Sequence, residues 1–254
     1  MFKLYGVPLS PFARKALLVL DYKELKYENL PTFPGDASSE FRKISPLGKI
    51  PVLDHDGFTI PDTSVICRYL DRIAPQKPIY PTDPKLEAKA LWLEEYADSR
   101  LVETCAALFR ERLLKPKMMQ QPTDEAAVQN ILENTMPECL AYLESVVPES
   151  GYLVGDSLSI ADVAVVTCFI QARYGDFDVD GKRAPKLRRY LDQAFAAPLV
   201  VKRLAAEQGG HAAGLGLVRA RDCQSGAGVR RGTAGARCRL RGEREVRRQP
   251  ARDR

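Results

Sequence analysis

The first 76 residues combine short apolar runs with amphipathic segments, a pattern typical of a small mixed sheet covered by helices. Runs rich in β-branched and aromatic residues predict strands, and apolar residues spaced three and four apart predict helices. A hairpin with its turn at residues 54–57 closes the strand series. The predicted order is strand, helix, strand, helix, hairpin and helix, at residues 2–5, 12–20, 27–30, 36–44, 51–60 and 63–74.

A second pattern begins after a proline-rich stretch. Residues 75–84 hold four prolines in ten positions, which makes a semi-rigid linker, and we place the linker between the domains at residues 77–84. Beyond it the apolar spacing is helical throughout. The predicted helices cover residues 85–114, ending at Pro116, and 124–147, bent at Pro137, followed by one that opens at Ser159 and two more at 185–196 and 198–208.

The helix that opens at Ser159 carries a specific start signal. Ser159 can cap the first turn while Asp162, three residues on, returns a bond to the Ser159 backbone. The apolar run at residues 163–170 follows directly. We therefore expect this helix to be the most deeply buried one of the second domain.

The net charge of +5 comes from one end of the chain. Residues 209–254 hold twelve Arg, no Lys and four acidic residues, a net charge of +8, so residues 1–208 carry −3. The same segment holds nine of the seventeen glycines and no Phe, Tyr or Trp. We interpret it as a disordered Arg/Gly/Ala-rich tail or as an out-of-frame translation of GC-rich DNA; an Arg-rich segment that binds nucleic acid or anionic lipid is the alternative.

Cysteine and histidine usage disfavours metal and disulfide chemistry. The six cysteines form no C-x-x-C motif, and the only histidines are His55 and His211. The chain opens on a strand rather than a secretory signal, and its longest apolar stretch is far shorter than the ~20 residues of a membrane helix. We expect a soluble cytoplasmic protein that binds no metal.

Three segments of the first domain carry candidate chemistry. Pro51 opens a strand although proline cannot donate to a sheet ladder. If the bond from Ile50 to Pro51 is cis, the neighbouring backbone groups stay free to pair with a bound peptide. Ser10 and Asp62 each precede a predicted helix, where a plain N-cap is the simplest interpretation.

Together, Ser10-Pro11-Phe12, the loop around Pro51 and Asp62-Thr63 resemble the glutathione S-transferases, in particular the serine-type, cytosolic, bacterial-like members. The resemblance covers residues 1–208. It implies a thioredoxin-like α/β glutathione-binding domain at residues 1–76 and an all-α helical bundle at 85–208 that supplies the hydrophobic substrate pocket.

The resemblance assigns the thiol-activating role to Ser10, which would donate a hydrogen bond to the glutathione thiolate. A thiol with a pKa near 8.5 is only roughly 3% ionised at pH 7, and lowering that pKa by about two units needs about 2.7 kcal/mol. A charge-assisted hydrogen bond of roughly 1.5–3 kcal/mol can supply this.

Tyr5, in the first strand, is the alternative activator. The family's thiol-reductase branch has Cys-Pro-Phe at this turn, so disulfide chemistry is disfavoured.

The resemblance also implies the glutathione contacts. Ile50 would pair, backbone to backbone, with the cysteinyl unit beside the structural cis-proline Pro51. Asp62 and Thr63 would bind the γ-glutamyl end. Lys49 is either a solvated loop charge or the contact of the glycyl carboxylate.

The expected activity is that of a glutathione transferase, which joins glutathione, as co-substrate, to a small hydrophobic electrophile. The alternatives are a glutathione-dependent peroxidase or isomerase, and a non-catalytic glutathione-binding scaffold. The resemblance implies a homodimer, with Asp98 approaching the glutathione amine of a partner subunit. The electrophile pocket would lie near Leu9, Phe12 and residues 96–100. We expect no nucleic-acid or membrane partner for the folded part.

Overall fold

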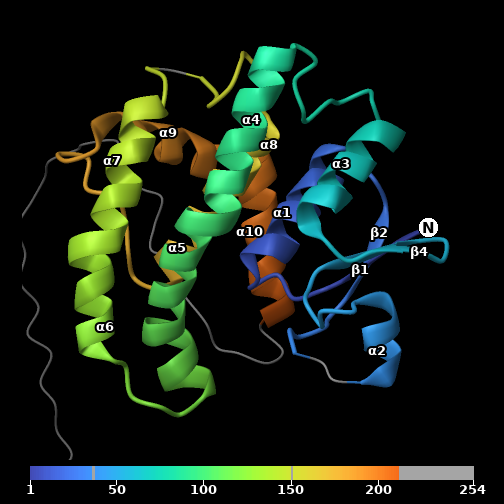
Figure 1. The fold of residues 1–254 in the computed structure, drawn as a ribbon, viewed down its shortest axis with the longest axis horizontal. Helices are drawn as coiled ribbons and strands as arrows, with labels where there is room; N and C mark the ends of the chain where they lie inside the picture. The colour runs from blue at the N-terminus through green and yellow to red at the C-terminus, as the bar shows by residue number, and fades with distance from the viewer. Residues whose placement is uncertain (36–37, 150, 212–254) are drawn as a thin grey trace, which may run out of the picture. The chain divides into compact units, whose positions relative to one another are not determined.

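Four strands form the sheet of the first domain in the computed structural model, which describes residues 1–35, 38–149 and 151–211 (Figure 1). The sheet order is β2-β1-β3-β4, with β1 and β2 parallel and the other pairs antiparallel. This confirms the predicted mixed sheet. The strands are β1 Phe2–Tyr5, β2 Tyr27–Leu30, β3 Val52–His55 and β4 Phe58–Ile60.

Helices cover both faces of this sheet. Successive strand residues point to opposite faces, and in β3 Leu53 packs into the large core while Val52 packs with Phe41 of α2 in a separate small cluster. Leu53 therefore faces α1 and α3, and Val52 faces α2. The helices are α1 Pro11–Tyr22, α2 Ser39–Ile44 and α3 Thr63–Ile73. The result is the predicted thioredoxin-like α/β domain.

The rest of the described chain is helical, as predicted. Two long helices each contain π-helical segments, and three further helices follow them (Figure 1). Together they form the predicted all-α domain. The first long helix comprises α4 Pro84–Tyr96, η1 Ala97–Leu101, α5 Val102–Phe109 and η2 Arg110–Met118; the second comprises α6 Glu125–Asn130, η3 Ile131–Thr135 and α7 Met136–Val146; the others are α8 Ile160–Tyr174, α9 Pro185–Ala196 and α10 Pro198–His211.

Two predicted helix ends were wrong. Pro116 lies inside η2 and does not end the helix, because a proline in the last turn removes only one backbone donor. The Met119 N–H still closes that turn on the Leu114 carbonyl at 2.9 Å. At the other end of the domain, α10 runs to His211, past the expected boundary at residue 208. Residues 212–254 of the predicted tail lie outside the described residues.

The core of the helical domain is α8, as the apolar run predicts. Thirteen of its fifteen residues are buried, and the capping box of Ser159 and Asp162 is present. The Asp162 carboxylate accepts hydrogen bonds from the Ser159 N–H at 2.9 Å and from the Tyr190 hydroxyl at 2.9 Å. Burial raises the pKa of Asp162, against the effect of these bonds. The box therefore joins the start of α8 to α9.

Buried ion pairs join the first domain to the helical domain. Arg14 of α1 donates to Glu207 of α10 at 2.9 Å, and both side chains are almost fully buried. Further along the two helices, Arg203 lies 3.3 Å from Asp21, so α1 and α10 run in opposite directions. The C-terminal end of α10 therefore lies near the N-terminal end of α1.

Candidate active site

The strand register brings three predicted site segments to one end of the sheet. Tyr5, the last residue of β1, pairs with Val52, the first residue of β3. Leu53 pairs with Ile60, the last residue of β4. The turn after β1, the residues before β3 and the start of α3 after β4 therefore share this end.

Gly6 lets the start of α1 approach the proline loop closely. A Cβ atom at Gly6 would lie 3.1 Å from the Ala13 Cβ and 3.6 Å from the Pro51 Cβ. A larger residue at position 6 would therefore push α1 and Pro51 apart. In the structure the Ile50–Pro51 peptide bond is cis.

Ser10 is the N-cap residue of α1. Its Oγ accepts a hydrogen bond from the Ala13 N–H at 3.4 Å, which is long for this type of bond. The Ser10 side chain is half-buried, and no acceptor for its hydroxyl proton is recorded among the described residues. The hydroxyl therefore retains a proton that it can donate to an anion at the helix N-terminus.

Ile50 presents backbone groups at the same end of the sheet. Its side chain is buried beside Val52, and its N–H and C=O have no recorded partner within the described part of the chain. Lys49 is exposed, and its carbonyl accepts from the Ser45 hydroxyl at 2.7 Å. This bond fixes the loop, while the Lys49 ammonium remains in solvent.

Asp62 and Thr63 lie at the start of α3, at the end of the sheet where Ile50 and Pro51 precede β3. One oxygen of Asp62 caps the helix by accepting from the Val65 N–H at 3.0 Å, and its side chain is exposed. The structure records no hydrogen bond to its second oxygen from any described residue. Thr63 is buried at 5% exposure, so this pair places an exposed carboxylate beside a buried Thr residue.

A buried charged cluster lies directly behind this pair, and the sequence analysis missed it. The Lys15 ammonium binds Glu94 at 2.8 Å, Ser64 at 3.2 Å and also Asp98. Burial lowers the pKa of Lys15, but the Asp98 and Glu94 carboxylates outweigh burial and raise it. Two adjacent cations inside an otherwise apolar helix, Arg14 and Lys15, were the available signal.

Asp98 has a second partner within the chain. Besides Lys15, its carboxylate accepts from the Ser64 hydroxyl at 3.0 Å within the same chain. It therefore stabilises the junction of α1, α3 and the long helix. The expected approach of Asp98 to the glutathione of a partner subunit stays a prediction.

Tyr5 is half-buried against Phe41, Ile50 and Val52. Its ring thus packs in the small cluster on the α2 face of the sheet, while Ser10 caps α1, which packs on the opposite face. This arrangement favours Ser10 over Tyr5 as the group that contacts a thiolate.

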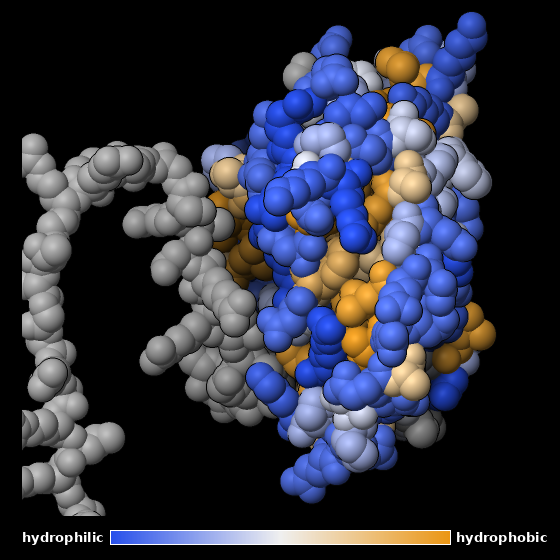
Figure 2. Space-filling model, turned by 90° about the vertical axis from the view of Figure 1, so that its left-hand side faces the viewer, coloured by the Kyte–Doolittle hydropathy of each residue, from blue (hydrophilic) through white to orange (hydrophobic). Residues whose placement is uncertain are grey.

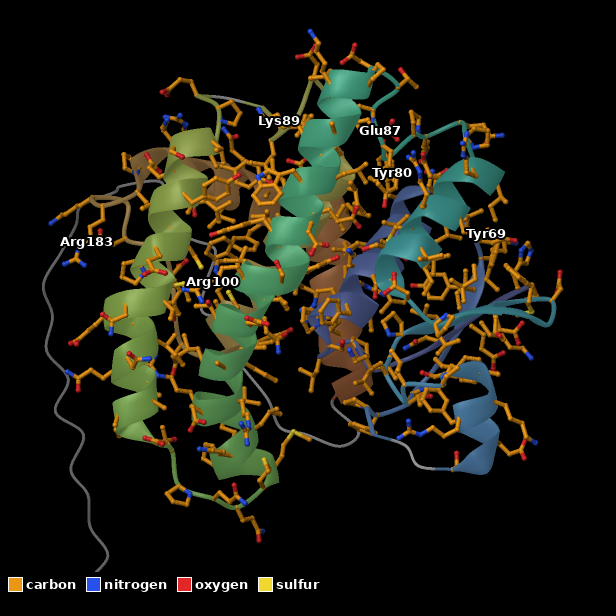
Figure 3. The ribbon with its side chains drawn as sticks, in the orientation of Figure 1. Tyr69, Tyr80, Glu87, Lys89, Arg100 and Arg183 are labelled. Atoms are coloured by element: carbon orange, nitrogen blue, oxygen red, sulfur yellow. The ribbon has the colours of Figure 1, made fainter. Side chains whose placement is uncertain are left out.

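Two of the predicted pocket residues of the long helix, Tyr96 and Arg100, contact α7. Tyr96 packs against Tyr142 with ring centroids 4.5 Å apart, and Arg100 binds Glu138 at 2.6 Å, between the long helix and α7 (Figure 3). On the face that carries α6 and α7, hydrophobic residues appear between hydrophilic ridges (Figure 2). Leu9 and Phe12 are half-buried at the start of α1. The electrophile pocket expected near these residues stays a prediction.

Within residues 1–35, 38–149 and 151–211, no group of three or more His, Cys, Asp or Glu side chains is arranged to hold a metal ion. No helix in these segments is long and apolar enough to cross a membrane.

Comparison with known proteins identifies both domains of the chain. Residues 4–78 match the model of the glutathione S-transferase N-terminal domain, and residues 109–207 match that of its C-terminal domain. Protein LigF from Sphingobium sp. is 26% identical over 78% of this chain and 91% of its own length. A probable glutathione S-transferase from Nicotiana tabacum is 25% identical over 75% of this chain and 82% of its own.

A solved structure shows the same fold. The glutathione S-transferase from Rhodospirillum rubrum superposes with a TM-score of 0.71 at 27% identity, covering 80% of this chain and 92% of its own. Both domains and their order are thus accounted for, and the chain belongs to the glutathione S-transferase family.

Proposed function

We propose that this protein is a glutathione transferase in which Ser10 stabilises the thiolate of glutathione for attack on a hydrophobic electrophile. The carbon–sulfur bond forms as the leaving group departs, or as an activated double bond takes up the thiolate and then a proton. Glutathione is a co-substrate in this reaction. Family membership supports glutathione-dependent chemistry in general; the role of Ser10 is our inference.

The observation that carries this proposal is the state of the Ser10 hydroxyl. It lies at the N-terminus of α1 and keeps its proton available, because its capping bond to Ala13 uses only an oxygen lone pair. A hydroxyl donor and a helix N-terminus both favour an adjacent negative charge. Each therefore lowers the pKa of a thiol bound there.

The remaining contacts follow from the shared end of the sheet. The backbone of Ile50 would pair with the cysteinyl unit, next to Pro51. The carboxylate of Asp62 and the hydroxyl of Thr63 would take the γ-glutamyl amine and carboxylate. The exposed ammonium of Lys49 would meet the glycyl carboxylate. Together these contacts would hold an extended tripeptide across the end of the sheet.

Turnover of 1-chloro-2,4-dinitrobenzene by Ser10→Ala tests the reaction. If Ser10 lowers the thiol pKa from about 8.5 to about 6.5, its loss reduces the ionised fraction at pH 7 from roughly 75% to roughly 3%. We therefore expect about a 25-fold lower rate at pH 7. Asp124→Ala, which removes the cap of the remote helix α6, is the matched control. An equal rate in wild type and Ser10→Ala would transfer the role to another group.

A second candidate reaction is glutathione-dependent ether cleavage. It is favoured by the match to LigF, a beta-etherase, over 91% of that protein's length. The thiolate would attack the carbon that bears an aryloxy group, forming the carbon–sulfur bond and expelling the phenolate. Release of a phenol from a β-aryl ether in the presence of glutathione would support it. Absence of turnover with either substrate, and of retention on immobilised glutathione, would favour the scaffold alternative.

We also propose that two copies of the chain associate. Phe58 of β4 and Val65 of α3 are more than half exposed, and the Phe58 ring lies 5.8 Å from that of Tyr69. Val65 and Tyr69 share one side of α3, one turn apart. We name these three residues the α3 patch. Apolar side chains gathered in this way favour a protein interface over solvent.

Sedimentation of wild type and Val65→Glu tests the dimer. We expect wild type to sediment as a dimer and Val65→Glu as a monomer, since a charge in an interface core has no partner there. Val201→Glu, at a similarly exposed site on α10, is the control. A monomeric wild type, or a Val65→Glu dimer, would remove the α3 patch from the interface.

We place this chemistry in the cytoplasm, as a detoxifying reaction that makes hydrophobic electrophiles water-soluble. The described cysteines Cys67, Cys105, Cys139 and Cys168 are buried free thiols, as is usual in a reducing compartment.

A further inference from the structure

A cavity of about 450 Å³ lies at the far end of α1 from Ser10. Leu18 and Tyr22 of α1 line one side, and α8, α9 and the start of α10 provide the others. These helices lie together in the fold (Figure 1). Because an α-helix rises 1.5 Å per residue, Leu18 is about 12 Å along α1 from Ser10 and Tyr22 about 18 Å. The cavity is therefore separate from the proposed glutathione site.

The inner part of the cavity is apolar, and the charged side chain that lines it already has hydrogen-bond partners. Leu18, Val163, Val166 and Val200 are buried and line it. Asp162 is the one charged side chain among the described residues of the lining. Its oxygens already accept from the Leu153 N–H, the Ser159 N–H and hydroxyl, and the Tyr190 hydroxyl, at 2.8–2.9 Å.

The mouth of the cavity differs from its floor. Tyr152 and Gln193 are exposed there, and Tyr22 is half-buried between mouth and floor. Their polar groups have no recorded hydrogen-bond partner among the residues that the structure describes, so they are available to a ligand. Burial raises the pKa of Tyr22, which keeps its hydroxyl in the neutral, proton-donating form.

We propose that this cavity is a second binding site, for an uncharged aromatic molecule with an apolar body and one hydrogen-bonding end. Its volume lies within the range of about 300–1,000 Å³ usual for small-molecule sites, and its apolar lining with a few polar groups is typical of them. The apolar body would occupy the floor, between the aliphatic side chains. The polar end would reach the hydroxyls and the amide at the mouth.

The charged groups around the cavity favour an uncharged ligand. Lys77, the cation near Tyr22, is already paired with Glu24 at 2.6 Å. An anion in the cavity would lose its hydration without gaining a free cation, and it would approach the Asp162 carboxylate. A cation would meet a carboxylate whose oxygens are already bonded. Either charged ligand would lose hydration free energy that no interaction in the cavity offsets.

Fluorescence titration of the full-length protein with N-phenyl-1-naphthylamine tests the proposal. The anionic comparison is 8-anilino-1-naphthalenesulfonate, which has the same rings plus a sulfonate. We expect one neutral probe per chain, bound at least about tenfold more tightly than the sulfonate. S-hexylglutathione, which would occupy the proposed glutathione and electrophile sites, should leave the probe bound. No binding of the neutral probe, or its displacement by S-hexylglutathione, would overturn the proposal.

Two variants locate the probe. Ala194→Trp on α9 should fill the cavity and weaken binding more than about tenfold, whereas Ala196→Trp, exposed on the same helix and outside the lining, should bind as wild type. If Ala194→Trp fails to fold, the exposed Tyr152→Ala serves instead, with an expected loss of about fivefold from the missing aromatic contact. Wild-type affinity in a folded cavity variant would place the probe elsewhere. None of these outcomes depends on catalysis, so the test is independent of the proposed transferase activity.

Discussion

At the scale of single residues, Asp62 combines two roles that one substitution can separate. One carboxylate oxygen caps α3 through the Val65 N–H, and the other is available for the glutathione amine. Asparagine keeps a capping oxygen and removes the charge. We expect Asp62→Asn to raise the KM for glutathione about tenfold with little change in Tm, because a charge-assisted bond of roughly 1.5–3 kcal/mol is weakened.

Asp62→Ala provides the comparison, since it also removes the cap and should cost about 1 kcal/mol of folding stability. The thiol pKa should be nearly unchanged in both variants, because Asp62 would contact the end of glutathione remote from sulfur. Steady-state kinetics and a thermal melt measure the two effects. If Asp62→Asn melts like Asp62→Ala and keeps the wild-type KM, Asp62 has only a structural role.

Residue patterns located Ser10, Asp62 and the Ser159–Asp162 box because each begins a helix, and helix starts have a local sequence signature. The buried positions of Arg14 and Lys15 have no such signature. Their partners Glu207, Glu94 and Asp98 lie at least 79 residues away in the sequence, and only the packing of α1 against the helical domain brings them together. The role of a single residue could therefore be predicted where its partners lie close to it in the sequence.

At the scale of elements, the Lys15 cluster holds α1, α3 and the long helix together. Removing Lys15 leaves the buried Glu94 and the half-buried Asp98 without the cation that they share. We expect Lys15→Met to lower the free energy of unfolding by about 3–5 kcal/mol. Lys43→Met, which breaks an exposed pair with Glu40, should cost no more than about 1 kcal/mol. Denaturant titration measures both.

The pH dependence of this effect has a definite sign. The folded-state pKa of Lys15 is raised above its ordinary value of 10.5, so its stabilising contribution is complete below that pH and is lost as the pH rises above it. The cost of Lys15→Met should therefore not fall between about pH 6 and about pH 9. A cost that shrinks between these values would mean that Lys15 loses its proton in the folded protein near neutral pH.

The apolar periodicity predicted every described strand and helix, with errors confined to ends. The Pro116 error has a physical cause: a proline breaks a helix interior, but in a last turn it removes only one donor. The π-helical segments η1, η2 and η3 have the same apolar faces as regular helices and could not be distinguished by pattern.

At the scale of the whole molecule, the described fold is closed by α10. Glu207, near the end of that helix, binds the buried Arg14 of α1. Residues 212–254 contain twelve Arg and no Phe, Tyr or Trp, so they offer little apolar surface to offset the roughly 1–2 kcal/mol per residue that ordering costs. We predict that truncation after His211 leaves Tm and conjugation activity unchanged and lowers salt-sensitive retention on anionic resins. A fall of several degrees in Tm would show that these residues contribute to the fold.

The central claim is that Ser10 lowers the thiol pKa of bound glutathione. The most direct measurement is a pH titration of the ultraviolet absorbance of the thiolate in the complexes of wild type and Ser10→Ala with glutathione. We predict an apparent thiol pKa of about 6.5 in wild type and about 8.5 in Ser10→Ala, a difference of about 2.7 kcal/mol. The same apparent pKa in both complexes would contradict the account and leave Ser10 as a helix cap alone.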